Sequence, residues 1–270
     1  MMTDHTQGHS TQAQRVVFIT GASSGIGRAT ALSFARAGYH VAGTARRADK
    51  LHSLQEEINA LSTPHGEFLP LVSDVTDAQS LIEASAQTVA VFGRLDILVA
   101  NAGVGHRGAL VDAEWDGLQT LLRTNIDGVL HSVRACVPHM RANGSGHIMT
   151  ISSVAYNLVS PYAASYAASK AFVTSIANSI RIELASDNIL VSDFLVGRTE
   201  TEFNEKRLGE GARSGSNLPT MHPESVADAI VKTAQKPKNT VILRFFDRLI
   251  VWGNRLVPGI IGALAKRQYK

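Results

Sequence analysis

The sequence predicts one α/β domain: a doubly wound parallel sheet of about seven strands, with helices on both faces. Short apolar, β-branched segments alternate with amphipathic helices along most of the chain, and this alternation is typical of parallel sheets. The first apolar segment runs directly into a glycine-rich turn and then into a helix. A chain of 270 residues, 44% of them apolar and 18% charged, is long enough for one sizeable core.

The expected elements follow one another in a regular order. Strands are expected at residues 16–20, 39–45, 67–74, 95–100, 147–151, 189–195 and 240–246. Helices are expected at 28–37, 48–61, between 76 and 92, at 112–141, from 165 onward, and at 223–235. Thr76 is expected to cap the third helix, which ends near Phe92 and Gly93, and Pro223 opens the last one.

The two ends of the chain differ in composition from the rest. Residues 1–14 are polar, lack the apolar core of a signal peptide and are expected to form a disordered tail. No apolar run reaches about 18 residues, so we expect no membrane span and a cytoplasmic protein. Residues 244–270 hold six Lys/Arg and one Asp, a charge of +5, which leaves −2 of the net +3 for the remainder. A nucleic-acid partner is therefore not expected.

The single cysteine, Cys136, excludes an internal disulfide and a cysteine metal cluster. Its neighbours Val133 and Val137 indicate a position in a helix core, and no metal site is expected.

The glycine-rich turn T-G-A-S-S-G-I-G covers Thr20 to Gly27. Its glycines allow a tight turn and a close approach of backbone N–H groups to a phosphate, while the following helix presents its positive N-terminus. The spacing G-x-x-x-G-x-G departs from the common dinucleotide pattern G-x-G-x-x-G. The strand, turn and helix in succession nevertheless predict a nucleotide site, although many such turns only connect elements.

The second expected strand ends in Arg46 and Arg47, with no acid before Asp49. An acid at this place usually holds the ribose diol of NAD, whereas guanidinium groups match a 2′-phosphate in charge and geometry. The pattern therefore favours NADP(H), and the alternative is a solvated basic turn.

Polar groups also follow the third and fourth strands, where parallel sheets place ligand contacts. Asp74 is a candidate acceptor for an adenine amino group, or else assists the next turn. Asn101 to Gly103, N-A-G, brings a glycine that permits close approach to a ligand. Asn125 interrupts a largely apolar helix, either as a satisfied core amide or as a kink that holds a water near Lys170.

Tyr166 and Lys170 lie four residues apart and share one face of the expected helix. A lysine cation about 4 Å from a phenol, at an effective dielectric of about 20, favours the phenolate by at most about 4 kcal/mol, or roughly three pKa units. This pair is thus a candidate proton-transfer device, and Ser153, at the end of the fifth strand, is placed to hold a carbonyl oxygen beside it. The alternative is a solvent-facing helix and an ordinary strand end.

Two segments are candidates for substrate contact. Residues 198–222 form a loop without periodicity, which suits a substrate lid. Residues 247–270 are apolar with basic neighbours. The first interpretation is that they pack over the substrate pocket or against a second subunit, and the second is that they bind an anionic membrane reversibly. We favour the first, because Pro258 and three glycines interrupt a long amphipathic helix.

From about residue 16 to residue 246 the chain resembles the short-chain dehydrogenase/reductase family in its compact single-domain form. The resemblance rests on the glycine turn, on N-A-G, and on Ser153 with Tyr-x-x-x-Lys at Tyr166, in the right order. It implies a Rossmann-type NADP-binding and catalytic domain over residues 15–246. Ala100 stands where many members have asparagine, and Val196 stands where they have proline before Gly197, which puts the backbone beside the nicotinamide in doubt.

The resemblance implies roles for individual residues. Tyr166 becomes the general acid/base, Ser153 orients the carbonyl, Lys170 lowers the tyrosine pKa and binds the nicotinamide ribose, and Asn125 holds a water in the proton relay. The implied cofactor contacts are Gly21, Ser23, Ser24, Gly25, Ile26, Gly27, Arg46, Arg47, Asp74, Val75, Asn101, Ala102, Gly103, Tyr166, Lys170, Gly197 and Thr199, with Thr201 also available.

The function implied is an NADP(H)-dependent carbonyl reductase or alcohol dehydrogenase that acts on a small, apolar substrate. The alternative is a non-catalytic NADP-binding module for redox sensing or interaction, against which the complete set of catalytic residues argues. The resemblance also implies a homodimer or homotetramer that pairs through the helices carrying Asn125 and Tyr166.

Overall fold

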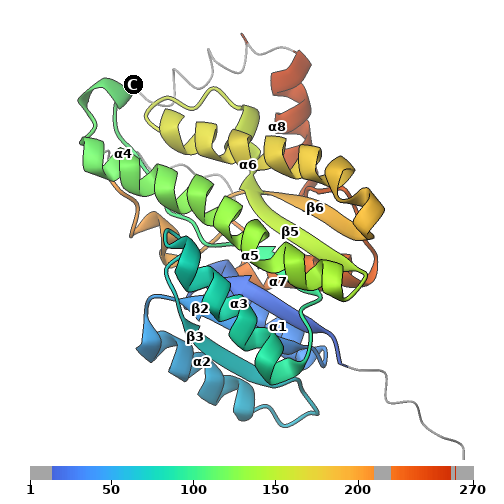
Figure 1. Cartoon of the computed structure of the whole chain (residues 1–270). Coiled ribbons are helices and arrows are strands. Elements are labelled where there is room, and N and C mark those ends of the chain that lie inside the picture. Colours follow the sequence, from blue (N-terminus) through green and yellow to red (C-terminus); the bar gives the residue numbers. More distant parts are fainter. Residues whose placement is uncertain (1–13, 210–219, 257–258, 260–270) are drawn as a thin grey trace, which may run out of the picture.

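Seven parallel strands form the centre of the protein (Figure 1). The computed structural model describes residues 14–209, 220–256 and 259. The strand order is β3-β2-β1-β4-β5-β6-β7, and every neighbouring pair is parallel. The predicted doubly wound sheet is confirmed. Outside the described residues lie 1–13 of the tail predicted at 1–14, the centre of the loop at 210–219, and the chain at 257–258 and 260–270.

The strands and the helices alternate as expected. The strands are β1 Val16–Thr20, β2 His40–Ala45, β3 Phe68–Val72, β4 Ile97–Ala100, β5 Gly146–Ser153, β6 Ile189–Val196 and β7 Thr240–Val241. The α-helices are α1 Gly25–Arg36, α2 Ala48–Asn59, α3 Ala78–Phe92, α4 Trp115–Leu122, α5 Gly128–Ala142, α6 Ala164–Glu183, α7 Pro223–Gln235 and α8 Phe245–Leu256. Short helical turns are η1 Leu110–Asp112, η2 Arg123–Asp127, η3 Val154–Asn157, η4 Ala185–Asp187 and η5 Glu202–Asn204.

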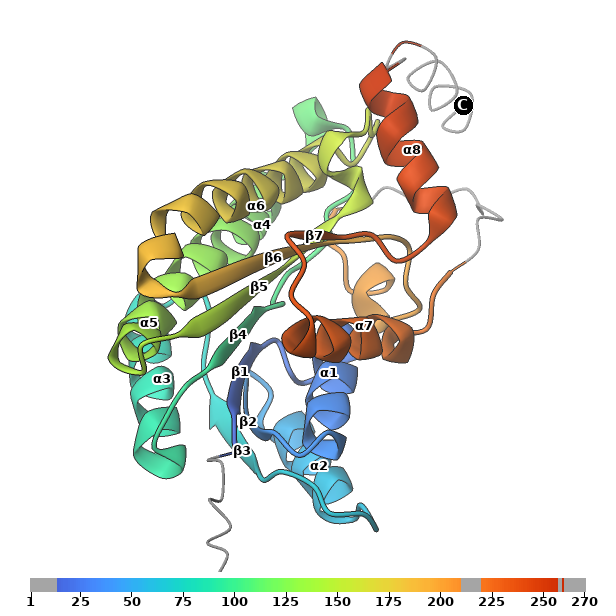
Figure 2. The same cartoon turned by 90° about the vertical axis from the view of Figure 1, so that its right-hand side faces the viewer.

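Two apolar layers hold the helices against the sheet. Helices α1, α2 and α7 cover one face, and α3, α4, α5 and α6 cover the other (Figure 2). The first layer includes Phe34, Leu54 and Ile230, and the second includes Leu81, Met140 and Val173. Because both faces are covered, the central strands are apolar on both sides, which explains their continuous apolar runs.

The strand order reverses between β1 and β4. In a doubly wound sheet the crevice at this point, beyond the carboxyl ends of the strands, is where ligands bind. The glycine turn follows β1, and Asn101 follows β4, so both lie at this crevice. The topology therefore brings together motifs that are about 80 residues apart in the chain.

Three local predictions were wrong in detail. Asp77, not Thr76, caps α3, because its carboxylate accepts hydrogen bonds from the amides of Gln79 and Ser80 at 2.9 and 3.4 Å. Thr76 instead bonds to Asp74 through its amide and hydroxyl. The continuous helix expected at 112–141 is divided by the π-helical turn η2.

The seventh strand is the third correction. It was expected at 240–246, but only Thr240 and Val241 pair with β6, and a helix begins at Phe245. The apolar residues from 245 onward follow helical spacing, which the strand prediction overlooked. In the part of the chain that the structure describes, none of the helices has the length and apolar character needed to cross a bilayer.

Candidate functional site

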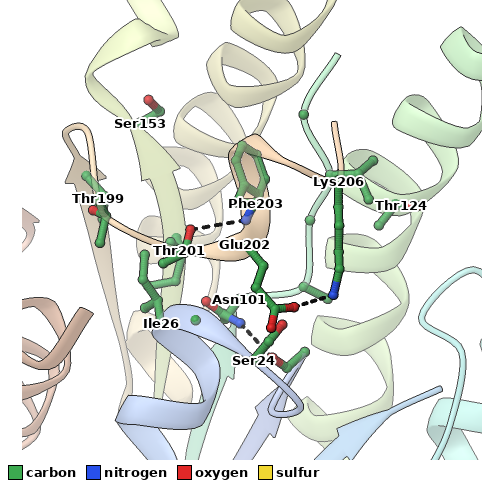
Figure 3. Close-up of a pocket in the computed structure, with 18 of the residues that line it drawn as sticks. Ser24, Ile26, Asn101, Thr124, Ser153, Thr199, Thr201, Glu202, Phe203 and Lys206 are labelled. Carbon is green, nitrogen blue, oxygen red and sulfur yellow. Dashed lines mark hydrogen bonds and ion pairs between the residues drawn. The ribbon is translucent and has the colours of Figure 1, made fainter. Parts of the chain in front are cut away.

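A cleft of about 660 Å³ opens at the carboxyl ends of the strands. The glycine turn, the ends of β2 to β6, η3, the start of α6 and the loop after β6 line it (Figure 3). The predicted site residues that line it are Gly21, Ser23, Ser24, Gly25, Ile26, Arg46, Arg47, Asp74, Val75, Asn101, Ala102, Gly103, Ser153, Tyr166, Lys170, Gly197 and Thr199. Gly27 and Asn125 contact this wall from behind. A volume of this size is typical of small-molecule and cofactor sites.

The glycine turn is packed too closely for side chains. Gly21 and Gly25 have φ angles of +71° and +54°, which favour glycine. A Cβ on Gly27 would lie 2.3 Å from the Gly21 carbonyl oxygen and 2.5 Å from Asn101 Nδ2. Asn101 Nδ2 donates to the Thr20 carbonyl at 2.9 Å, so this amide fastens the turn to the end of β4. The turn thereby keeps a backbone surface that phosphate groups can approach.

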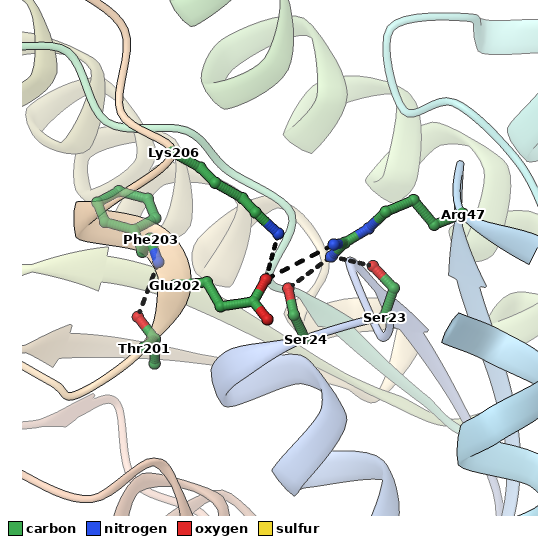
Figure 4. A network of polar contacts seen from close by, with 7 residues as sticks. All are labelled: Ser23, Ser24, Arg47, Thr201, Glu202, Phe203 and Lys206. Atoms are coloured by element: carbon green, nitrogen blue, oxygen red, sulfur yellow. Dashed lines mark hydrogen bonds and ion pairs between the residues drawn. The ribbon is translucent and has the colours of Figure 1, made fainter. Parts of the chain in front are cut away.

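Of the two arginines after β2, Arg47 is the one bonded to the glycine turn. Its Nη2 donates to Ser23 Oγ at 3.0 Å and to Ser24 Oγ at 2.9 Å (Figure 4). Arg46, whose side chain is 70% exposed, lies 3.8 Å from a carboxylate oxygen of Asp74. Both guanidinium groups line the cleft, and they place positive charge beside the glycine turn.

Glu202, in η5, reaches across the cleft to this cationic edge. Its carboxylate lies 3.6 Å from Arg47 Nη1 and contacts Lys206 Nζ (Figure 4). Thr201 starts η5 by accepting a bond from the Phe203 amide, and the Phe203 ring lies 5.8 Å from that of Tyr166. The described part of the predicted lid, residues 198–209, thus lies over the cleft. Sequence reasoning missed Glu202, Phe203 and Lys206, although Glu and Lys four residues apart are a known helical pair.

Asp74 assists the turn before α3, which is the second of the two roles considered for it. Its Oδ1 accepts from the amide and the hydroxyl of Thr76, both at 2.9 Å. Next to it, the carbonyl of Val75 accepts from His131 Nδ1 at 3.0 Å. Both residues line the cleft, so contact with a ligand is open to them as well.

Tyr166 and Lys170 meet Ser153 inside the cleft. Tyr166 hydrogen-bonds to Ser153, and Lys170 Nζ lies 5.9 Å from the centroid of the tyrosine ring. The Lys170 ammonium donates to the carbonyl of Ile151 at 2.8 Å and is 5% exposed. The helix α6 and the end of β5 therefore hold a phenol, an ammonium and a hydroxyl together.

Burial dominates the ionisation of both groups in the protein alone. It raises the pKa of Tyr166, and the hydrogen bond from Ser153 opposes this. It lowers the pKa of Lys170 to about 8, and the charge of Asp193 opposes this. Removal of the phenol from water is the largest influence on the tyrosine pKa here, and the expected lowering of that pKa by Lys170 stays a prediction.

A buried carboxylate on β6 supports this cluster. Asp193 accepts hydrogen bonds from Thr150 and Thr174, each at 2.7 Å, and is 1% exposed. Thr174 bonds to Ser152 at 2.8 Å, and Ser152 bonds to the Lys170 carbonyl at 2.9 Å. Burial raises the pKa of Asp193, while the two threonines and Lys170 oppose this. Sequence reasoning missed Asp193 because it lies within an apolar strand.

Asn125 is fully buried in the π-helical turn. Its Oδ1 accepts from the Val104 amide at 2.8 Å, and its Nδ2 donates to the Val104 carbonyl and to Ser169 Oγ, both at 3.0 Å. The side chain is thus a satisfied core amide, and the backbone is kinked at the same residue. The core amide considered for Asn125 is therefore observed, in a π-helical turn that distorts the helix at this residue, whereas the water near Lys170 stays a prediction.

Residues Arg244 and Asp247 of the C-terminal segment pack against the backbone at Gly197, directly after Val196. Val196 pairs with Ser153 as the last residue of β6. A Cβ on Gly197 would lie 2.3 Å from Asp247 Oδ2 and 2.6 Å from Arg244 Nη2. The ion pair of Arg244 and Asp247, at 2.7 Å, therefore packs directly on this part of the cleft wall.

Comparison with known proteins identifies the family. The short chain dehydrogenase family model matches residues 15–210. The chain belongs to this family. The short-chain dehydrogenases it resembles are oxidoreductases, so the protein is an oxidoreductase with a nucleotide-binding fold.

Individual relatives show how the family match extends. A 3-oxoacyl-[acyl-carrier-protein] reductase of Thermotoga maritima is 35% identical over 232 residues, which cover 84% of this chain and 93% of the relative. An alcohol dehydrogenase structure from Thermococcus sibiricus, complexed with 5-hydroxy-NADP, has a TM-score of 0.76 at 26% identity, covering 86% of this chain and 96% of that one. A 3-ketoacyl-(acyl-carrier-protein) reductase structure from Brucella melitensis, complexed with NADH, has a TM-score of 0.75 at 25% identity, covering 85% and 95%.

The packing of the glycine turn predicts a sharp effect for Gly27→Ala. The added methyl group meets backbone and the Asn101 amide, so we expect a loss of about 1–3 kcal/mol in the free energy of unfolding together with loss of dinucleotide binding. Gly108→Ala is the matched control, because its Cβ would meet only His106 at 3.7 Å. Denaturant unfolding and NADPH titration measure both. Equal stability and equal NADPH binding in the two variants would contradict the close packing at Gly27.

Proposed function

We propose that the protein is an NADP(H)-dependent oxidoreductase that interconverts a carbonyl and a primary or secondary alcohol, with Tyr166 as the general acid/base. One observation carries this proposal: Ser153, Tyr166 and Lys170 share a single cleft with a glycine turn and two arginines. The first three groups suit proton transfer to an oxygen, and the others suit a phosphorylated dinucleotide.

The residues at the turn fit a dinucleotide. Side chains are excluded where the diphosphate would approach Gly21 and Gly27. Ser24, at the N-terminus of α1, makes no capping hydrogen bond, so the helix end is left for another acceptor. Arg46 and Arg47 would hold the 2′-phosphate of NADP, and Glu202 would leave Arg47 when that phosphate enters. Gly103, Lys170 and Thr199 would contact the nicotinamide half.

When bound, NADPH supplies the hydride for the carbonyl carbon. Ser153 would orient the carbonyl oxygen, and Tyr166 would donate its phenolic proton to that oxygen as the alcohol forms. The raised pKa of Tyr166 keeps the proton on the phenol at neutral pH, as the reduction requires. Lys170 would stabilise the resulting phenolate, and the kinked backbone at Asn125 would hold a water that returns a proton.

The substrate is expected to be small and apolar. Phe203 lies beside Tyr166, and Val154 and Leu208 also line the cleft.

Tyr166→Phe tests the proposed activity. The purified variant should bind NADPH as the wild type does and lose at least about 1,000-fold in turnover of ketones, aldehydes, quinones or steroids, because it lacks the proton donor. Oxidation of NADPH, followed by its absorbance, measures this. The proposal fails if the wild-type protein binds NADPH and turns over no member of the panel.

Cofactor selection depends on the two arginines. In Arg46→Ala and Arg47→Ala we expect NADPH binding to weaken about 10- to 100-fold, the cost of a lost charged hydrogen bond, while NADH binding changes little. Glu202→Gln is the control, since removing the carboxylate that faces Arg47 should not weaken NADPH binding. Parallel titrations of nicotinamide fluorescence give the constants. Tighter binding of NADH than of NADPH by the wild type would overturn this assignment.

The pH dependence of kcat/KM should reveal the ionisation of Lys170 and the influence of Asp193 on it. The pKa of Lys170 is about 8, so kcat/KM for reduction should fall as pH rises through this value and the ammonium is lost. Asp193→Asn removes the charge that keeps this pKa from falling further, so the decline should begin at lower pH. Asp116→Asn, an exposed change on α4, should leave the profile in place. If kcat/KM of Asp193→Asn fell over the same pH range as that of the wild type, the influence of Asp193 on Lys170 would be contradicted.

A further inference from the structure

Helix α8 is amphipathic, but its apolar side faces away from the protein. Phe245, Leu249, Trp252 and Leu256 are 72%, 54%, 67% and 73% exposed. Their spacing places them within an arc of about 60° on the helix surface. Phe246, 47% exposed, widens this apolar stripe on one side.

The opposite side of α8, which carries two polar residues beside Val251, is the side that contacts the domain. Asp247, Val251 and Asn254 are 2%, 7% and 8% exposed. Asp247 is paired with Arg244 against Gly197, and Asn254 Nδ2 donates to the carbonyl of Asn157 in η3. These bonds fix the rotation of the helix, so the apolar stripe cannot turn inward without breaking them.

In sequence, the charged residues that follow Asp247 are all of one sign. Asp247 is buried in its ion pair, and Arg248 is exposed. From residue 248 to residue 270 the sequence has five Lys/Arg, at positions 248, 255, 266, 267 and 270, and no Asp or Glu. An apolar stripe with aromatic residues and flanking cations is the pattern of a helix that lies in the surface of an anionic bilayer.

We propose that α8 binds the protein reversibly to anionic membrane surfaces, with Phe245, Leu249, Trp252 and Leu256 entering the headgroup region. A second copy of the chain is a less suitable partner for this stripe than an anionic membrane. A two-fold contact would bring the same cationic segment of each subunit together, and like charges would oppose it. Anionic lipid instead complements both the apolar stripe and the cations.

Vesicle sedimentation of the full-length protein tests this proposal. The wild type should bind vesicles of phosphatidylcholine with about one third phosphatidylglycerol, bind pure phosphatidylcholine weakly, and lose binding as salt rises. Leu249→Glu with Trp252→Glu should reduce the partition coefficient about 10- to 100-fold, because two apolar side chains are lost from the contact. Val111→Glu with Ile182→Glu, at sites 90% and 81% exposed, is matched in charge and should bind as the wild type does.

Two further measurements distinguish membrane binding by α8 from a contact between subunits. In the Trp115→Phe background, Trp252 is the remaining tryptophan, and its emission should shift to shorter wavelength when anionic vesicles are added. Light scattering gives the mass of each variant in solution. Binding that is equal for the wild type and the α8 variant would overturn the proposal. So would an α8 variant that changes only from oligomer to monomer, which would assign the stripe to a subunit contact.

Discussion

The proposed site depends on keeping the Lys170 ammonium charged although the residue is only 5% exposed. Burial works against the charge and lowers the pKa of Lys170 to about 8. The Ile151 carbonyl accepts from Nζ, and Asp193 supplies an opposite charge. Asp193 is in turn held by Thr150 and Thr174, so the cation is balanced by groups on two strands and one helix. A buried charge needs such partners, because an uncompensated one costs several kcal/mol.

The sheet explains why these groups meet. In a parallel sheet each crossover helix carries the chain back to the start of the next strand, so all the strands end at the same edge. The glycine turn after β1, the arginines after β2, Asn101 after β4 and Ser153 at the end of β5 all gather there. The loop after β6 reaches the same edge through Thr201 to Lys206, and the C-terminal segment reaches it through Arg244 and Asp247. The groups that we propose for catalysis and cofactor binding thus come together from distant parts of the sequence within one sheet.

The sequence predicted the sheet and most of the site, because these rest on short-range signals: apolar periodicity, glycines before a helix and Tyr-x-x-x-Lys spacing. What it missed depends on long-range packing. Asp193 lies within an apolar strand, and its partners come from β5 and α6. The contact of Glu202 with Arg47 joins residues 155 positions apart, by 202 − 47. The sequence offered Thr76 and Asp77 as neighbouring candidates for the cap of α3. Only the conformation of the turn decides that the Asp77 side chain is the one that reaches the first amides of the helix. The turned-out stripe of α8 depended on bonds to Asn157 and Arg244.

In the proposed mechanism, Lys170 favours the phenolate of Tyr166 despite burial. The most direct test is an NMR titration of the Tyr166 phenol in protein labelled at tyrosine Cζ, with Tyr166→Phe to assign the signal. We predict a lower pKa for Tyr166 in the wild type than in Lys170→Met, in the presence of NADP⁺. Equal pKa values in the two proteins would contradict the account, because the cation would then have no influence on the proton that the reaction moves.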